Sequence, residues 1–320
     1  MSRRRGIVEP VNSAVIDVPR DVRKKAGALG SPGAQWLADL PDVVRELEST
    51  WQVVVGGTLR GGSDSYVAAA ATEADEPAII KIALPNDGWA HEIDTLSLAN
   101  GRGYVRLLRH DADRQAMLQE RLGESLAQLR MPVAAQIEVI CETLRTTWTV
   151  PPDQRFPSGA QKARALAEFT SATWEALGRP CSANLIEHAA TFAERRAAAF
   201  DPDQAVLVHG DAHAANTLRI PGEGSTRFAF VDPDGLFAER ACDLAVPMRG
   251  WSQELLKGDT WCLARQRCSL LSELTGVDVQ PIWEWGLIER VSTGLLALQV
   301  GREALGNEML AVAERLATRA

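Results

Sequence analysis

Residues 209–216 read HGDAHAAN and residues 231–235 read VDPDG, and these two stretches are the most informative part of the chain. Asp211 and Asn216 stand five positions apart, which is the spacing of the catalytic base and a Mg²⁺ ligand on one loop of phosphoryl-transfer enzymes. Asp232 follows the apolar stretch FAFV and could meet Asn216 across one metal ion, because Mg²⁺ prefers carboxylate and carbonyl oxygens. Each motif alone also fits an ordinary turn, since Asp, Asn, Pro and Gly are turn residues.

A lysine lies inside an apolar stretch near the start of the chain. Lys81 stands within AIIKIAL, residues 78–84, which predicts a strand with a buried lysine that needs an anionic partner. Glu92 follows in a helical pattern, and kinases pair a strand lysine, which binds the α- and β-phosphates, with a glutamate on the next helix. The alternative is an edge-strand lysine that points to solvent.

Together these signals occur in the order that kinases use, so the sequence predicts an enzyme that transfers a phosphoryl group from ATP with the help of Mg²⁺. The phosphate loop is the weaker part of the pattern. Residues 59–65 read LRGGSDS, which matches neither G-x-G-x-x-G nor the Walker A motif. Backbone amides and the hydroxyl groups of Ser63 or Ser65 could still bind phosphates there.

The distribution of strand and helix patterns predicts an α+β, two-lobed, protein-kinase-like fold. Residues 1–120 are expected to form a small β-rich lobe with one inserted helix and an N-terminal helical extension, in which Pro41 would lie in the first turn of a helix. Residues 119–123 are expected to be a hinge. Residues 124–320 carry apolar residues at helical spacing and are expected to form a larger, mostly helical lobe.

Composition narrows the class of protein. The chain has 320 residues and a net charge of −8, without the dense basic patch of a nucleic-acid binder, so we expect no nucleic-acid partner. The five cysteines form no C-x-x-C pair, which indicates a reducing compartment. There is no signal-peptide pattern and no apolar run near the roughly 18 residues of a membrane span, so we expect a cytoplasmic protein.

These motifs resemble the aminoglycoside phosphotransferase family, whose catalytic loop reads H-G-D-x-H-x-x-N and is followed by D-P-x-G. The stretches VRLLRHD (105–111), MLQERL (117–122) and CDLA (242–245) also resemble that family. The stretches QWLADLP (35–41) and GRGYVRLL (101–108) are most similar to its streptomycin 6-phosphotransferase and hydroxyurea-kinase branch.

The resemblance implies a role for each matching residue. Asp211 would be the catalytic base, Asn216 and Asp232 would bind Mg²⁺, and Lys81, held by Glu92, would bind ATP. The hinge residues would bind adenine through their backbone, and three further residues would support the catalytic loop. The hinge residues are Gln119, Glu120, Arg121 and Leu122, and the loop supports are His209, His213 and Asp243.

The sequence predicts the type of reaction, but for the acceptor it predicts only a class of molecules. Family members act on aminoglycosides such as streptomycin and on hydroxyurea, amino sugars and choline-like amines, so a cationic small molecule is expected. Acidic residues of the helical lobe could bind it, or they could simply lie on a solvated helix face. Tryptophans could line its pocket, or they could belong to the core. These candidates are Glu239, Glu254, Asp259, Glu284, Glu289, Trp251, Trp283 and Trp285.

Two other functions remain open from the sequence. His209, Asp211 and His213 alternate along the catalytic loop and could hold a transition metal, which would indicate a metal-dependent hydrolase. The chain could also be a kinase fold that binds ligands without catalysis. The sequence predicts no oligomeric state.

Overall fold

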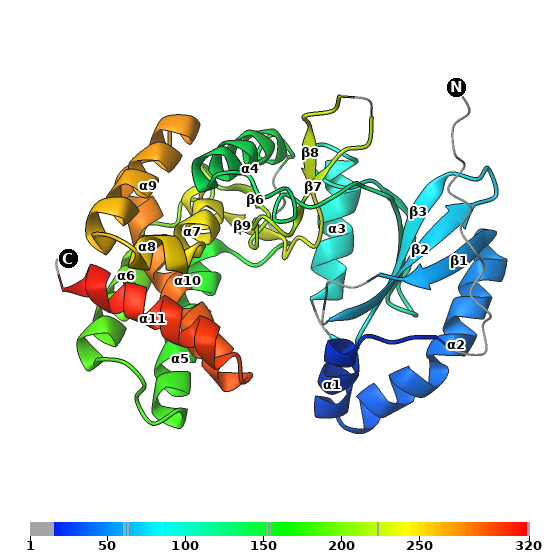
Figure 1. Cartoon of the computed structure of the whole chain (residues 1–320), viewed down its shortest axis with the longest axis horizontal. Coiled ribbons are helices and arrows are strands. Elements are labelled where there is room, and N and C mark those ends of the chain that lie inside the picture. Colours follow the sequence, from blue (N-terminus) through cyan, green and yellow to red (C-terminus); the bar gives the residue numbers. More distant parts are fainter. Residues whose placement is uncertain are drawn as a thin grey trace. The chain divides into compact units, whose positions relative to one another are not determined.

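The computed structural model describes residues 16–59, 62, 64–86, 88–151, 153, 155–222 and 224–318. Its contacts divide the chain into two compact units (Figure 1). The first unit comprises residues 1–101 and 105–123, and the second comprises residues 102–104 and 124–320. Within the described residues, every helix is too short or too polar to cross a bilayer.

The first unit is built on a five-stranded antiparallel sheet with the strand order β1-β2-β3-β5-β4. Strands β2, β3 and β5 are buried along most of their length, and their apolar side chains contribute to a core that includes Tyr66, Ile80 and Leu118. Helix α3 follows β3, which is the position expected for the inserted helix. The strands are β1 (Val53–Thr58), β2 (Ser65–Thr72), β3 (Pro77–Ala83), β4 (Leu107–Asp111) and β5 (Ala116–Glu120), and α3 is Trp89–Ala99.

Two helices precede this sheet, α1 (Arg20–Ala28) and α2 (Ser31–Trp51). The expectation that Pro41 lies in the first turn of a helix is wrong, because α2 begins ten residues earlier and Pro41 lies inside it. An interior proline costs a helix about 3 kcal/mol. Burial of Leu40, Val44 and Leu47 on one face of α2 offsets that cost, so the helix continues through Pro41.

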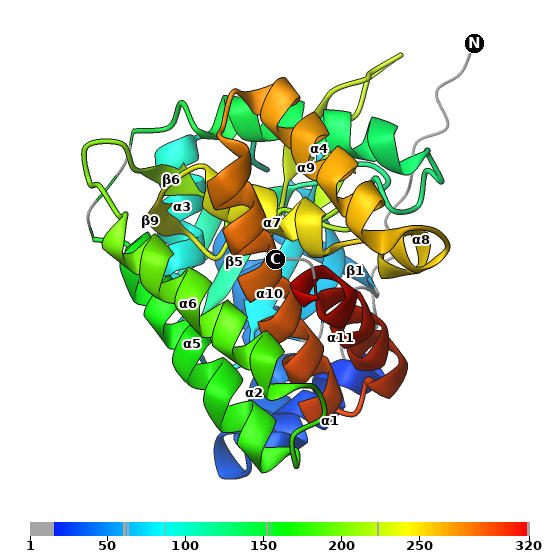
Figure 2. The ribbon, with the colours of Figure 1, turned by 90° about the vertical axis from the view of Figure 1, so that its left-hand side faces the viewer.

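The second unit is mostly helical and is organised around α10 (Val279–Gln299), which is buried along most of its length. Helices α5, α6, α7, α9 and α11 pack against α10, and Figure 2 shows α5 and α6 side by side next to it. The helices are α4 (Val133–Thr147), α5 (Gly159–Ala176), α6 (Ala183–Ala198), α7 (Ala241–Arg249), α8 (Ser252–Leu256), α9 (Thr260–Thr275) and α11 (Glu303–Ala317).

Two small antiparallel ladders in this unit carry the sequence motifs. Strand β6 (Val206–Val208) pairs with β9 (Leu236–Ala238), and β7 (Thr217–Arg219) pairs with β8 (Phe228–Phe230). The HGDAHAAN loop therefore runs from β6 to β7, and the VDPDG turn runs from β8 to β9. The two ladders bring the motifs together, because each motif joins one ladder to the other.

Candidate active site

In the first unit, Lys81 and Glu92 form a buried ion pair. The Lys81 Nζ atom lies 2.6 Å from Oε1 of Glu92, and the two side chains are 9% and 13% exposed. Lys81 sits at the centre of β3, opposite Val67 of β2 and Met117 of β5. The central strand and the following helix thus place a lysine and a glutamate in the arrangement that binds nucleotide phosphates in kinases.

The predicted hinge is partly engaged in hydrogen bonds within the first unit. The Glu120 N–H donates to the Arg106 carbonyl at 3.0 Å, and the Arg121 N–H donates to the Pro77 carbonyl at 3.3 Å. An adenine ring would therefore use other backbone groups of residues 119–122. The side chains of Gln119 and Leu122 are both buried.

Of the two serines expected to bind phosphates, Ser65 is buried at the start of β2, opposite Ala83. Ser63 lies outside the described residues.

In the second unit, Asp243 binds the backbone of the HGDAHAAN loop, residues 209–216, which is called the catalytic loop after its predicted role. Its Oδ1 accepts the Gly210 N–H at 2.8 Å, and its Oδ2 accepts the His209 N–H at 3.2 Å and Trp148 Nε1–H at 2.8 Å. The side chain is fully buried at the first turn of α7, and burial raises the pKa of Asp243. Three N–H donors stabilise the carboxylate in this position.

Both histidines of the loop are engaged by the protein. His209 Nδ1 accepts the Asp211 N–H at 3.1 Å, so Nε2 carries the proton and donates to the Val231 carbonyl at 3.0 Å. His213 Nδ1 accepts the Asn216 N–H at 3.2 Å, which leaves Nε2–H facing Oδ2 of Asp211 at 3.3 Å. Burial lowers the pKa of His209, so its imidazole is neutral.

This arrangement does not favour the hydrolase alternative. His209 uses both ring nitrogens for the backbone and has none left to ligate a metal. Across the part of the chain that the structure describes, no three His, Cys, Asp or Glu side chains are grouped to hold a metal ion.

Asp211 carries the charge of the loop and forms an ion pair with Arg249. Its Oδ1 accepts a hydrogen bond of 2.5 Å from Nη2 of Arg249, the last residue of α7, and its side chain is 31% exposed. Burial alone would raise the pKa of Asp211, but the hydrogen bond from His213 and the charge of Arg249 hold it well below its usual range. Asp211 is therefore an accessible carboxylate that is ionised at neutral pH.

Asn216 and Asp232 flank the same end of the β7–β8 ladder. The Val231 N–H donates to the Asn216 carbonyl at 2.9 Å, which places the two side chains on adjacent chain segments. Asn216 Nδ2 donates to the Asp211 carbonyl at 3.1 Å, so Oδ1 is the atom left for a ligand. Asp232 is exposed and has a positive φ of 56°, a conformation that costs free energy and is common at functional sites. This pair fits a Mg²⁺ ion, which takes oxygen ligands of these types.

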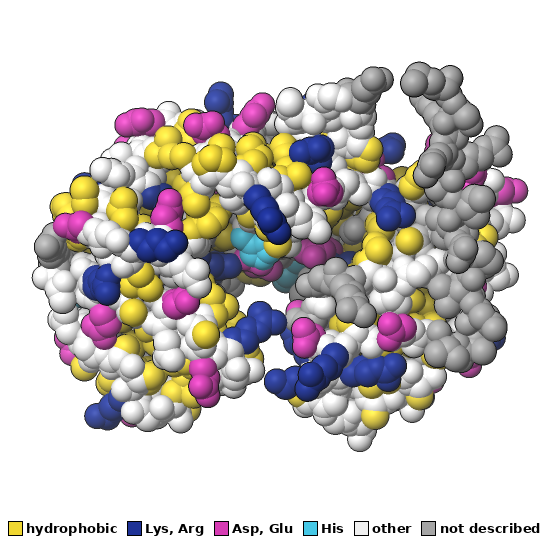
Figure 3. Space-filling view, viewed as in Figure 1, with side chains coloured by type: hydrophobic (Ala, Val, Ile, Leu, Met, Phe, Trp, Pro, Cys, Tyr) yellow, Lys and Arg dark blue, Asp and Glu magenta, His cyan; other side chains and the backbone are white. Residues whose placement is uncertain are grey.

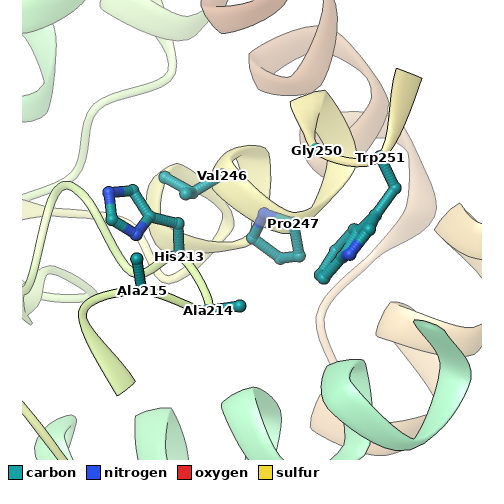
Figure 4. Close-up of a pocket in the computed structure, with 7 residues that line it drawn as sticks. All are labelled: His213, Ala214, Ala215, Val246, Pro247, Gly250 and Trp251. Atoms are coloured by element: carbon teal, nitrogen blue, oxygen red, sulfur yellow. The ribbon is translucent and has the colours of Figure 1, made fainter. Parts of the chain in front are cut away.

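A cavity of about 330 Å³ opens beside the catalytic loop (Figure 4). The rings of His213 and Trp251 border it from two ends, with Pro247 between them. The remaining lining comes from Ala214, Ala215, Val246 and Gly250. Because the His213 ring touches both the cavity and Asp211, a molecule in this cavity would lie close to the Asp211 carboxylate.

Trp251 is held in place by two buried arginines. Its φ is 49°, and the Arg267 guanidinium lies 5.5 Å from the centre of its indole ring. Arg267 also donates to the Gly250 carbonyl at 2.7 Å, and Arg290 donates to the Met248 carbonyl at 2.6 Å. These bonds fix the turn between α7 and α8 that presents Trp251.

The other residues considered for the acceptor pocket have structural partners. Trp283 and Trp285 are buried in α10, and Glu284 and Glu289 are buried ion-pair partners, so the solvated-face alternative is wrong for these two glutamates. Glu239 accepts a hydrogen bond from Trp285, Glu254 pairs with Arg267, and Asp259 caps α9. Figure 3 shows acidic and basic side chains interspersed over the face that it displays.

Sequence reasoning missed Arg249 and Lys162, and it considered Glu289 only as a candidate for the acceptor pocket, whereas Glu289 pairs with both of these cations beside the catalytic loop. Lysine is scarce in this chain, and that scarcity was the only signal that singled out Lys162. Nothing in the spacing of the three residues indicates that they meet.

Comparisons with known proteins agree on the type of molecule. The model of the aminoglycoside/hydroxyurea antibiotic resistance kinase family matches residues 50–301. Streptomycin 6-kinase of Streptomyces glaucescens is 28% identical over 309 residues, which cover 95% of this chain and 98% of that protein. Hydroxyurea phosphotransferase of Kitasatospora aureofaciens is 29% identical over 318 residues, which cover 96% of this chain and 88% of that protein.

Solved structures confirm the predicted fold. The structure of a spectinomycin phosphotransferase in complex with ADP and spectinomycin superimposes with a TM-score of 0.56 at 14% identity, covering 85% of this chain and 96% of that one. At such low identity the likeness shows the fold alone, which is the two-lobed, protein-kinase-like α+β fold expected from the sequence.

Proposed function

Because the chain belongs to the family of aminoglycoside/hydroxyurea antibiotic resistance kinases, we propose that it transfers the γ-phosphoryl group of ATP to a hydroxyl group of streptomycin or a closely related aminoglycoside. The family match confirms the resemblance and the small-molecule kinase activity predicted from the motifs. The observation that carries the proposal is the accessible, ionised Asp211 carboxylate beside the cavity that Trp251 borders.

Asp211 acts as the catalytic base in this proposal. Its carboxylate orients the acceptor hydroxyl and takes up the proton as the new P–O bond forms. Lys81, held by Glu92, binds the phosphates of ATP. Asn216 and Asp232 would hold Mg²⁺, which would neutralise charge on the phosphate oxygens.

The cavity favours a ring-sized acceptor. A volume of about 330 Å³ is at the lower end of the range for small-molecule sites and exceeds what hydroxyurea would fill. Trp251 and Pro247 offer apolar surface to one face of a sugar or cyclitol ring. The carboxylates of Asp211, whose side chain is 31% exposed, and of Asp234, an exposed residue, provide negative charge for the cationic groups of such an acceptor.

The test is ADP formation by the purified protein with ATP and Mg²⁺ against streptomycin, other aminoglycosides, hydroxyurea, glucosamine and choline. Mass spectrometry of the acceptor shows whether it gains one phosphoryl group. We expect saturable turnover with streptomycin and little with hydroxyurea. Turnover with hydroxyurea but not with any aminoglycoside would contradict the proposed acceptor and leave the reaction type intact.

A further inference from the structure

Beside the catalytic loop, side chains from three helices form a buried network of ion pairs in which positive and negative charges alternate. Glu289 of α10 accepts a hydrogen bond from Arg249 Nη1 of α7 at 2.6 Å on Oε2, and its Oε1 forms an ion pair with Lys162 Nζ of α5 at 2.8 Å. The Glu289 side chain is 4% exposed, and those of Arg249 and Lys162 are 15% and 13% exposed. Burial alone would raise the pKa of Glu289, but the charges of Lys162 and Arg249 hold it below its usual value.

Both cations of this ion-pair network, Lys162 and Arg249, contact the catalytic loop. Lys162 Nζ donates to the Gly210 carbonyl at 3.3 Å, and Arg249 Nη2 donates to Asp211 Oδ1 at 2.5 Å. Gly210 has a φ of 87°, and a Cβ there would lie 2.8 Å from Cβ of Asp234, so the backbone at this point is closely confined. The Glu289 carboxylate thus connects the backbone before the catalytic aspartate with the side chain of that aspartate.

The contacts of Asp211 distinguish its two oxygens. Oδ1 is occupied by Arg249, whose planar guanidinium bridges two carboxylates with separate nitrogens. Oδ2 faces His213, whose ring is 41% exposed and borders the cavity. Oδ2 is therefore the oxygen on the side from which an acceptor would approach.

We propose that Arg249 is a positioning residue for phosphoryl transfer, which fixes Oδ1 of Asp211 so that Oδ2 receives the proton of the acceptor hydroxyl, and that Glu289 and Lys162 hold Arg249 in place. The proposal rests on the proposed role of Asp211 as base. In the step, the acceptor O–H bond breaks as its oxygen bonds to the γ-phosphorus, the proton goes to Oδ2, and ADP leaves with the bridging oxygen.

The chain offers a closely matched control. Arg196 is 13% exposed and also bridges two glutamates, with Nε 2.6 Å from Glu284 Oε2 of α10 and Nη1 3.3 Å from Glu239 Oε2. It lies in the same unit, and among the described residues its ion pairs are with Glu284 and Glu239 and not with the catalytic loop. Arg196→Ala and Arg249→Ala therefore remove the same kind of buried bridge, but only Arg249→Ala releases Asp211.

The experiment measures kcat and the KM for the acceptor in wild type, Arg249→Ala, Arg249→Lys and Arg196→Ala, each at a temperature where thermal unfolding shows it folded. We expect Arg249→Ala to lower kcat about 100-fold with KM changed by less than about three-fold, since small misplacements of a catalytic group carry losses of this size. Arg249→Lys should recover part of kcat, and Arg196→Ala should keep it. An equal kcat loss in Arg196→Ala, or a change in KM alone for Arg249→Ala, would overturn the positioning role.

A second measurement distinguishes failure of the proposed function from failure of the positioning role. If wild type phosphorylates no acceptor of the panel, the proposed acceptor is wrong, and the positioning role is tested without substrate. A double-mutant cycle of Arg249→Ala and Asp211→Ala in chemical unfolding should show a coupling of about five-fold or more in the unfolding equilibrium constant. Additive effects would show that the two side chains are not paired and would refute the proposal.

Discussion

Oδ1 of Asp243 accepts the N–H of Gly210 at 2.8 Å, so the first turn of α7 supports the backbone of the catalytic loop directly. The same carboxylate also accepts the His209 N–H and the Trp148 indole N–H. One buried side chain therefore satisfies three donors from two separate parts of the lobe.

Asp243→Ala should be strongly destabilising. Three buried donors would lose their acceptor, which predicts a fall in the free energy of unfolding of about 3 kcal/mol or more. Chemical denaturation measures this fall, and Asp278→Ala is the control, because Asp278 precedes α10 without a side-chain capping bond. Similar small losses in both variants would contradict the support role.

Asp211→Ala should abolish transfer and leave nucleotide binding nearly unchanged. Loss of a general base reduces kcat by about 10²- to 10⁴-fold, while ATP is bound by other residues. Steady-state kinetics and calorimetric titration with an ATP analogue separate the two effects. A variant with near-normal turnover would exclude Asp211 as the base.

Asp232→Ala should weaken nucleotide binding only when Mg²⁺ is present. We expect a loss of about ten-fold or more in affinity for Mg²⁺–nucleotide, because one metal ligand is removed. Calorimetry with and without Mg²⁺ is the measurement, and Asp203→Ala tests the loss of an exposed aspartate elsewhere in the unit. Unchanged affinity in Mg²⁺ would remove Asp232 from the metal site.

Trp251→Ala should raise the KM for the acceptor by about ten-fold, because the apolar wall of the cavity is lost. Trp261→Ala is a matched control: Arg265 lies 5.8 Å from the Trp261 ring, much as Arg267 lies over Trp251, but Trp261 is not among the residues that line the cavity. Kinetics with the acceptor that the panel identifies compare the two. Equal effects on KM would show that Trp251 does not contact the acceptor.

His209 should remain neutral at pH values where an ordinary histidine takes up a proton. Burial lowers its pKa in the folded state, whereas the unfolded chain binds a proton near pH 6.5. Its contribution to stability is therefore complete above about pH 6.5 and falls as the pH drops below that value. Proton NMR of the five histidine rings, with assignment by single replacement, follows the titration. A midpoint for His209 at or above pH 6.5 would contradict the prediction.

The sequence predicted the parts of the fold that rest on local patterns. The strand that carries Lys81 follows from the short apolar run AIIKIAL, and the apolar stretch before Asp232 contains β8. The prediction that Pro41 lies in the first turn of a helix is wrong, although proline is common at that position. Burial of one face of α2 outweighs the cost of an interior proline.

The surroundings of Asp211, the proposed catalytic base, could not be predicted in the same way. Lys162, Glu289 and Arg249 come from three helices that are far apart in the chain, and ion pairs of that range leave no trace in residue spacing. The acidic residues of α10 were for the same reason considered as pocket residues or as a solvated face. Only the packing of the helices shows that their charges are compensated inside the lobe.

The arginines beneath Trp251 have a consequence for inhibition. Arg267 and Arg290 bind the carbonyls of the turn between α7 and α8, so contacts within the protein hold the indole wall in place. A rigid, flat compound that stacks on Trp251 would lose little entropy through ordering of the protein when it binds. Such compounds are better starting points for competitive inhibitors than flexible, multiply charged mimics of an antibiotic.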